Sequence, residues 1–169
     1  PAADVDLNGP WRLNAAGSSD TTDADIPGCV HTDLLSAGII DEPFYRANEG
    51  SVLWVEDVAW EYSKRFFLPA EVLAEDRVDL VFEGLDTHAS AYLNGKMILR
   101  ADNMFRVYRT PCRDLLVAGE NELRVVFEPA AGHDRTAREG SPYGYPGGDR
   151  VFSRKAAYHY GWDWAPRMV

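Results

Sequence analysis

The sequence has few cysteines and no long apolar run. Cys29 and Cys112 are its only two cysteines, and they form neither a CxxC pair nor a cluster with histidine. This spacing argues against a zinc motif or a disulfide framework, so we expect two buried free thiols and no metal or other cofactor. No segment reaches the roughly 20 apolar residues that a membrane-spanning helix needs. We therefore expect no membrane partner.

Basic residues are also scarce. The chain carries 17 Lys+Arg against 27 Asp+Glu, a formal net charge of -10. Such a surface repels the phosphate backbone that nucleic-acid-binding proteins must attract, so nucleic acid is not an expected partner. The charge is neutral evidence on sugars, because hydroxyl groups are recognised by short-range hydrogen bonds and apolar contacts.

Targeting and glycosylation signals are missing as well. The first six residues lack the basic and apolar regions of a signal peptide, and no asparagine lies in an N-x-Ser/Thr acceptor. We expect a bacterial cytoplasmic origin, with a secreted or lysosomal one left open.

The patterns that are present indicate one all-β domain over residues 1–169. Bulky β-forming residues alternate with polar ones from Val52 to Phe67, and Asn94-Gly95 separates two apolar runs as in a type I′ hairpin. Short strands divided by turn residues are typical of a β-sandwich or jelly roll. Strands are predicted over 11–13, 52–67, 78–82, 89–93, 97–99, 105–108 and 122–127.

Two other segments do not follow the strand pattern. Thr32 is positioned to cap one short helix over 33–37, with Gly38 ending it in the left-handed conformation. Residues 130–150 are rich in Gly and Pro, which predicts a long functional loop. Residues 15–25 are also predicted as a loop.

Four ordered segments resemble the N-terminal domain of β-mannosidases in glycoside hydrolase family 2, and the resemblance runs from about Trp11 to Arg167. The most specific segment is the last one, RKAAYHYGWDW at 154–164. The others are PGCVHTDL at 27–34, DEPFYRANE at 41–49, and FEGLDT at 82–87 followed by LNG at 93–95.

The resemblance implies a galactose-binding-domain-like jelly-roll sandwich that is a fragment of a longer multidomain enzyme. In that family a (β/α)₈ barrel of roughly 250 residues carries both catalytic glutamates, so this chain is too short to hold it beside a sandwich. The resemblance therefore implies that no catalytic residue lies in this chain. It also implies two partners, the missing barrel of the same protein and a β-mannoside. The parent enzyme would remove terminal β-D-mannose with retention, while this fragment alone is expected to be inactive.

By the same resemblance, Trp162 and Asp163 are the expected substrate-binding residues, with Trp162 lining the mannose site and Asp163 binding a hydroxyl. The chemistry fits, because a carboxylate accepts hydrogen bonds from hydroxyls while an indole covers the apolar side of a sugar ring. In a regular strand Trp162 and Trp164 face one side and Asp163 the other, so Trp164 is predicted to be the structural member. Ala165 replaces the family's usual Gly, which would strain the segment if that position needs positive φ.

Other polar residues have simpler interpretations. Arg154 and Lys155 are predicted to be a solvated pair, although either could steady the segment through a carboxylate such as Asp163. His31 and His159 are predicted to be structural. Solvated loop acids are predicted at 41, 42 and 49, and turn or core roles at 86–88 and 103–105.

Three alternatives remain open at this level. In the first, Trp162 and Trp164 are core residues and Asp163 caps a turn. In the second, the chain is a stand-alone carbohydrate-binding, lectin-like module, since jelly rolls often serve as lectins. In the third, the domain only packs or dimerises.

Overall fold

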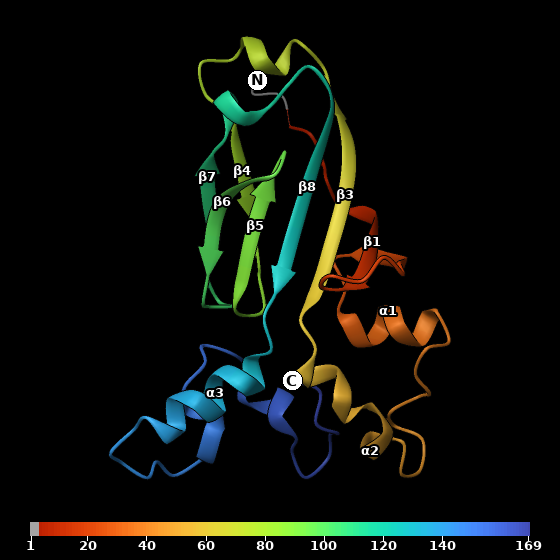
Figure 1. Cartoon of the computed structure of the whole chain (residues 1–169), viewed down its shortest axis with the longest axis vertical. Coiled ribbons are helices and arrows are strands. Elements are labelled where there is room, and N and C mark those ends of the chain that lie inside the picture. The colour runs from red at the N-terminus through yellow and green to blue at the C-terminus, as the bar shows by residue number, and fades with distance from the viewer. Residues whose placement is uncertain (1–3) are drawn as a thin grey trace.

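The computed structural model describes residues 4–169, so the first three of the six N-terminal residues discussed above lie outside the described part. Six antiparallel strands form one sheet in the order β2-β1-β3-β8-β5-β6, and β4 pairs with β7 in a second, smaller sheet (Figure 1). This arrangement is the predicted all-β sandwich. The strands are β1 Gly9–Ala15, β2 Thr22–Ile26, β3 Trp60–Leu68, β4 Asp79–Phe82, β5 Ala89–Leu93, β6 Lys96–Ala101, β7 Tyr108–Pro111 and β8 Gly119–Phe127.

Inward-facing side chains of the strands build the core. Every second residue of β8 is buried, at Asn121, Leu123 and Val125, as a half-buried strand requires. Leu13 of β1 and Ala91 of β5 are fully buried in the same cluster. The alternation seen in the sequence therefore identifies the core face correctly where a strand is regular.

The hairpin predicted at Asn94-Gly95 is confirmed. Both residues have positive φ, at 49° and 80°, as a type I′ turn requires. Asn94 also uses its side chain, since its amide donates to Asn121 Oδ1 at 2.8 Å and its Oδ1 accepts from the Glu122 amide at 2.9 Å. The turn is thus tied to β8 as well as joining β5 to β6.

The N-terminal helix is present, but its predicted cap is wrong. Helix α1 spans Val30–Ser36 with Cys29 at its N-cap position, and the Thr32 hydroxyl accepts a hydrogen bond from the Cys29 amide at 3.3 Å. Gly38 follows with the expected positive φ. The Tyr62 hydroxyl donates to Asp33 Oδ2 at 2.7 Å, which joins α1 to β3.

Helix content was underestimated, because more than one short helix is present. Helix α3 occupies Ala130–Glu139 within the predicted loop, since the Pro and Gly residues that break helices lie mainly beyond Glu139. Helix α2 spans Glu49–Val52, and short 3₁₀ helices are η1 Leu53–Asp57, η2 Val72–Ala74, η3 Arg113–Leu115, η4 Gly148–Val151 and η5 Ala157–Tyr160. No helix among residues 4–169 is both long and apolar enough to cross a membrane.

Four further local predictions need correction. The strand predicted from Val52 begins only at Trp60, because α2 and η1 precede it. The strand predicted over 105–108 begins at Tyr108, and β2 lies partly inside the predicted loop over 15–25. Cys112 is a buried free thiol as predicted, but Cys29 is exposed at the start of α1.

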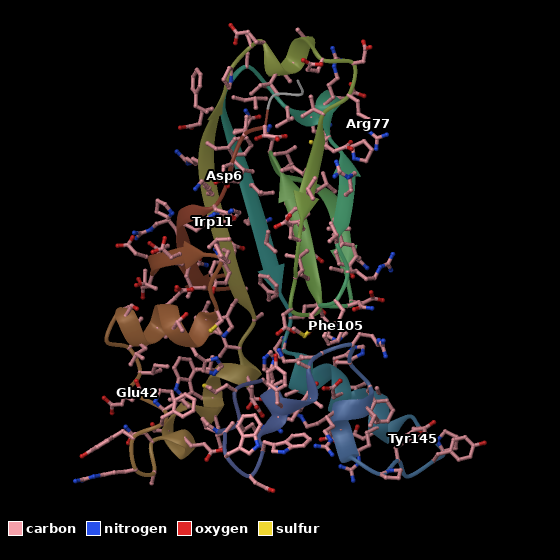
Figure 2. The ribbon with its side chains drawn as sticks, turned by 180° about the vertical axis from the view of Figure 1, so that it is seen from behind. Asp6, Trp11, Glu42, Arg77, Phe105 and Tyr145 are labelled. Carbon is pink, nitrogen blue, oxygen red and sulfur yellow. The ribbon has the colours of Figure 1, made fainter. Side chains whose placement is uncertain are left out.

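Helices α2 and α3, η1 and the C-terminal segment gather at one end of the sandwich (Figure 1). In Figure 2 the labelled Glu42, Phe105 and Tyr145 lie toward this end, whereas Arg77 lies near the other. We call this end the helical end; it comprises α2, η1, α3 and residues 140–169. It contains the segment in which the sequence places the candidate site.

Candidate functional site

The candidate residues lie on a tight turn, not on a strand. The Trp162 amide donates to the Ala165 carbonyl at 3.1 Å, and the Ala165 amide donates to the Trp162 carbonyl at 3.3 Å. These reciprocal bonds put Asp163 and Trp164 at the tip of the turn. The strand alternation assumed for these residues is therefore wrong, and their side chains do not divide between two sheet faces.

All three side chains at the turn are accessible. Trp162 is 47% exposed and Trp164 is 72% exposed. The alternative in which both are core residues of this domain is therefore wrong, and the structural role predicted for Trp164 is not a place in its core. Asp163 is exposed and has no hydrogen-bond or ion-pair partner among residues 4–169. The turn therefore presents an unpaired carboxylate beside two accessible tryptophan side chains.

Ala165 does not strain the turn. Only Arg46 and Asn94 have positive φ among the non-glycine residues that the structure describes. Ala165 therefore does not have the positive φ that would strain an alanine.

An ion pair between a buried lysine and a partly exposed aspartate connects the C-terminal segment to the sandwich. The side chain of Lys155 is 6% exposed, and its ammonium donates to Asp86 Oδ2 at 2.7 Å. His159 Nδ1 lies 3.3 Å from the same oxygen, without hydrogen-bond geometry. The predicted solvation of Lys155 is therefore wrong: it is buried and pairs with Asp86, for which the sequence predicted only a turn or core role. Arg154 is exposed as predicted.

The charges in this cluster shift two pKa values. Burial alone raises the pKa of Asp86, but His159 and the Lys155 ammonium outweigh it and hold the pKa well below the usual carboxyl range. Burial, with the positive charge of Lys155, lowers the pKa of His31 to about 4. His31 is thus a buried, neutral histidine at neutral pH, in agreement with its predicted structural role.

A fully buried carboxylate, that of Asp134, holds the same segment against α3. Asp134 is completely buried and accepts hydrogen bonds from the Ser153 and Tyr160 hydroxyls. Burial and the Asp134 carboxylate both raise the pKa of Tyr160, so its hydroxyl stays protonated. Asp134 was not identified from the sequence, where it lies in a region predicted to be a loop.

His88 and His133 lie beside Asp134, close enough for the three to be considered as metal ligands. The two rings lie with their centroids 3.9 Å apart and their planes tilted by 32°. His88 Nε2 is already 2.8 Å from Ser153 Oγ, and both carboxylate oxygens of Asp134 accept hydroxyl bonds. The group is therefore best described as a hydrogen-bonded cluster.

The end of the chain is held by Arg167. Its guanidinium makes two hydrogen bonds to Glu56 of η1, at 2.7 and 3.0 Å, and its amide donates to Glu49 Oε1 at 2.9 Å. Glu49 is exposed as predicted but has this structural partner. The turn at Trp162 therefore lies between attachment points at Tyr160 and Arg167.

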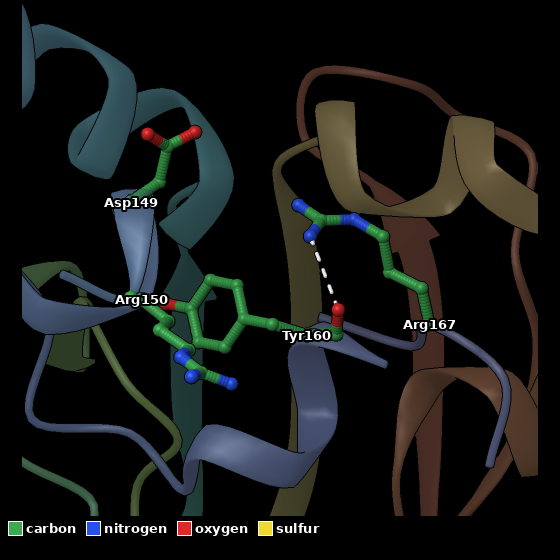
Figure 3. A pocket seen from close by; sticks show the side chains of 5 residues that line it. Asp149, Arg150, Tyr160 and Arg167 are labelled. Atoms are coloured by element: carbon green, nitrogen blue, oxygen red, sulfur yellow. Dashed lines mark hydrogen bonds between the residues drawn. The ribbon is translucent and has the colours of Figure 1, made fainter. Parts of the chain in front are cut away.

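A shallow hollow of about 190 Å³ lies next to the turn (Figure 3). Arg150 places its guanidinium over the Trp162 ring, 5.3 Å from the centroid, and Arg167 donates to the Tyr160 carbonyl at 3.4 Å. Sequence reasoning missed Arg150, because nothing in the local pattern relates residue 150 to residue 162. The hollow is lined by Gly147, Asp149, Arg150, Tyr160 and Arg167.

The six-stranded and two-stranded sheets, with an aromatic turn at one end, define a β-sandwich of the galactose-binding-like class. Within that class, the family model described as glycosyl hydrolase 2 galactose-binding domain-like matches residues 11–169. The chain belongs to this family, which confirms the resemblance drawn from the sequence.

Several proteins of similar sequence are β-mannosidases. "Beta-mannosidase B" of Emericella nidulans is 41% identical over 85% of this chain and 18% of its own length, and "Beta-mannosidase" of Bos taurus is 34% identical over 96% and 20%. The crystal structure of β-D-mannosidase from Dictyoglomus thermophilum has a TM-score of 0.93 and 43% identity, over 96% of this chain and 20% of that one. The chain thus spans about a fifth of the length of these relatives.

Proposed function

We propose that this chain is the N-terminal domain of a β-mannosidase and contributes Trp162 and Asp163 to a pocket completed by a (β/α)₈ barrel. The parent enzyme would hydrolyse terminal β-D-mannose residues with retention of configuration. The observation that carries the proposal is the exposed turn, on which the unpaired Asp163 carboxylate lies beside the Trp162 indole.

The proposed division of labour follows from the chemistry. A retaining glycosidase needs two carboxyl groups about 5 Å apart, one as nucleophile and one as acid/base. In the proposal these come from the barrel, for which the greater length of the relatives leaves room. Asp163 would accept a hydrogen bond from a mannose hydroxyl, and Trp162 would cover the apolar face of the ring.

The hollow supports a shared pocket more than an independent lectin. Its volume of about 190 Å³ is below the roughly 300–1,000 Å³ of a typical ligand site. A sugar placed here would stay largely exposed unless another domain covered it. We therefore favour the role of a pocket wall.

The test is Asp163→Ala in the full-length protein, assayed with an aryl β-mannoside. We expect kcat/KM to fall by the equivalent of about 2 kcal/mol or more, because a charge-assisted hydrogen bond in a covered site is lost. Asp114→Ala is the matched control, since that carboxylate is 96% exposed on η3, distant from the turn. Unchanged kinetics for Asp163→Ala would refute the assigned role.

A further inference from the structure

Arg150 differs from the other charged residues that line the hollow. Asp149 is paired with Arg138 at 2.8 Å, and Arg167 is paired with Glu56 at 2.7 Å. Arg150 has no carboxylate partner among the residues that the structure describes. Its charge and its N–H donors are therefore available to a ligand.

Two neighbours hold the Arg150 guanidinium in place. On one side is the Trp162 ring, at 5.3 Å from its centroid. On the other is Gly147, where a Cβ would lie only 3.3 Å from Arg150 Nε and where φ is +103°. Glycine at 147 thus leaves space for the guanidinium and adopts a backbone conformation that other residues disfavour.

A planar guanidinium held against an aromatic ring keeps the donors along its edge free. Other polar groups at the hollow are engaged, since the Tyr160 hydroxyl donates to Asp134 and its carbonyl accepts from Arg167. The hollow therefore offers donors to a ligand rich in acceptor oxygens. Because Arg150 lines the hollow and also lies over the Trp162 ring, that ligand would be continuous with a sugar bound at the turn.

We propose that Arg150 binds the second sugar unit of an oligosaccharide substrate by donating hydrogen bonds to its hydroxyl oxygens in this hollow. The inference rests on the proposed function, because it places the terminal mannose against Trp162 and Asp163. It assigns to this domain a role in selecting the leaving group as well as in binding the terminal sugar.

The experiment compares two substrates in the full-length protein. Mannobiose has hydroxyls on its second sugar, whereas phenyl β-mannoside has a leaving group without such hydroxyls. We expect Arg150→Ala to lower kcat/KM for mannobiose about tenfold, the order for losing a hydrogen bond from a charged donor, and to change it less than twofold for the phenyl mannoside. Arg150→Lys should also lower kcat/KM for mannobiose relative to that for phenyl β-mannoside, because an ammonium lacks the planar set of N–H donors of a guanidinium.

Arg138→Ala is the control for a change in the position of η4, since it removes the ion pair between η4 and α3 at Asp149 and leaves Arg150 in place. It should leave the ratio of the two kcat/KM values unchanged. Equal losses of kcat/KM on both substrates for Arg150→Ala would overturn the proposal and show that Arg150 only holds Trp162. No loss on either substrate would overturn it as well.

Asp163→Ala separates failure of the proposed function from failure of this inference. If the proposed function is wrong, Asp163→Ala leaves kcat/KM unchanged for both substrates.

Discussion

At the scale of single residues, buried charge determines how the C-terminal segment is attached. Lys155 is paired with Asp86, and burial together with the positive charge of Lys155 lowers the pKa of His31 and keeps it unprotonated. Removing one partner of such a pair leaves an uncompensated buried charge, which is costlier than the absence of both. The attachment of the segment that carries Trp162 is therefore sensitive to single substitutions at residues remote from the turn.

His31 predicts a pH dependence of stability. Its pKa is about 4 in the folded chain against 6.5 for the ordinary side chain, so the unfolded state takes up a proton first as pH falls. Its contribution is complete above pH 6.5 and is lost between about pH 6.5 and 4, by up to about 3 kcal/mol. We expect His31→Gln to flatten the pH dependence of the free energy of unfolding over this interval, measured by urea titration.

The control for this measurement is Met97→Gln, which introduces the same side chain at an exposed, non-titratable position of β6. It should keep the steep dependence of the unmodified chain. If His31→Gln keeps it too, His31 is not the group whose protonation destabilises the fold.

At the scale of elements, the strongest local pattern produced the best prediction. The β5–β6 hairpin follows from two adjacent residues that tolerate positive φ, so no distant contact is needed to specify it. The segment before β3 shows the opposite case. Alternating aromatic residues from Val52 suggested a strand, but α2 and η1 form there and bury Val52 and Val55 in the core.

The hairpin leads to a stability prediction. Gly95→Ala should lower the free energy of unfolding by about 1 kcal/mol, because Gly95 has a φ of 80° that alanine disfavours. A steric clash does not contribute, since an added Cβ would meet nothing within 4 Å. Gly50→Ala in α2 is the matched control, since it also has open space but no positive φ and should be neutral or slightly stabilising. Equal losses in the two variants, measured by chemical denaturation, would contradict the backbone explanation.

At the scale of the whole molecule, one end of the sandwich concentrates exposed aromatic residues. Trp164 at 72%, Phe44 at 66% and Tyr143 at 68% exposure belong to segments at or beside the helical end. We expect these exposed aromatic side chains to contact another domain. In the proposed enzyme it would face the other domains around the shared pocket.

Trp164 allows this interface to be tested. Trp164→Ala should change the free energy of unfolding of the chain by less than about 0.5 kcal/mol, because the side chain makes no core contact. In the full-length protein the same change should lower the thermal midpoint, since the indole would there be covered. Trp60→Ala is the positive control, because that indole is buried and its loss should cost about 3 kcal/mol or more in the chain itself.

A large loss for Trp164→Ala in the isolated chain would mean that Trp164 is part of this domain's own packing after all. An unchanged midpoint in the full-length protein would mean that no domain covers it.

The sequence by itself determined the all-β class, the core face of the regular strands, the Asn94-Gly95 turn and the family, because each depends on neighbouring residues or on an ordered set of motifs. It also singled out Trp162 and Asp163, whose binding role stays a prediction. Only the tertiary structure decided that these residues lie on an exposed turn, that Lys155 is buried against Asp86, 69 residues away, and that Arg150 covers Trp162. Such contacts depend on how the helical end packs against the sandwich, and no local pattern contains that information.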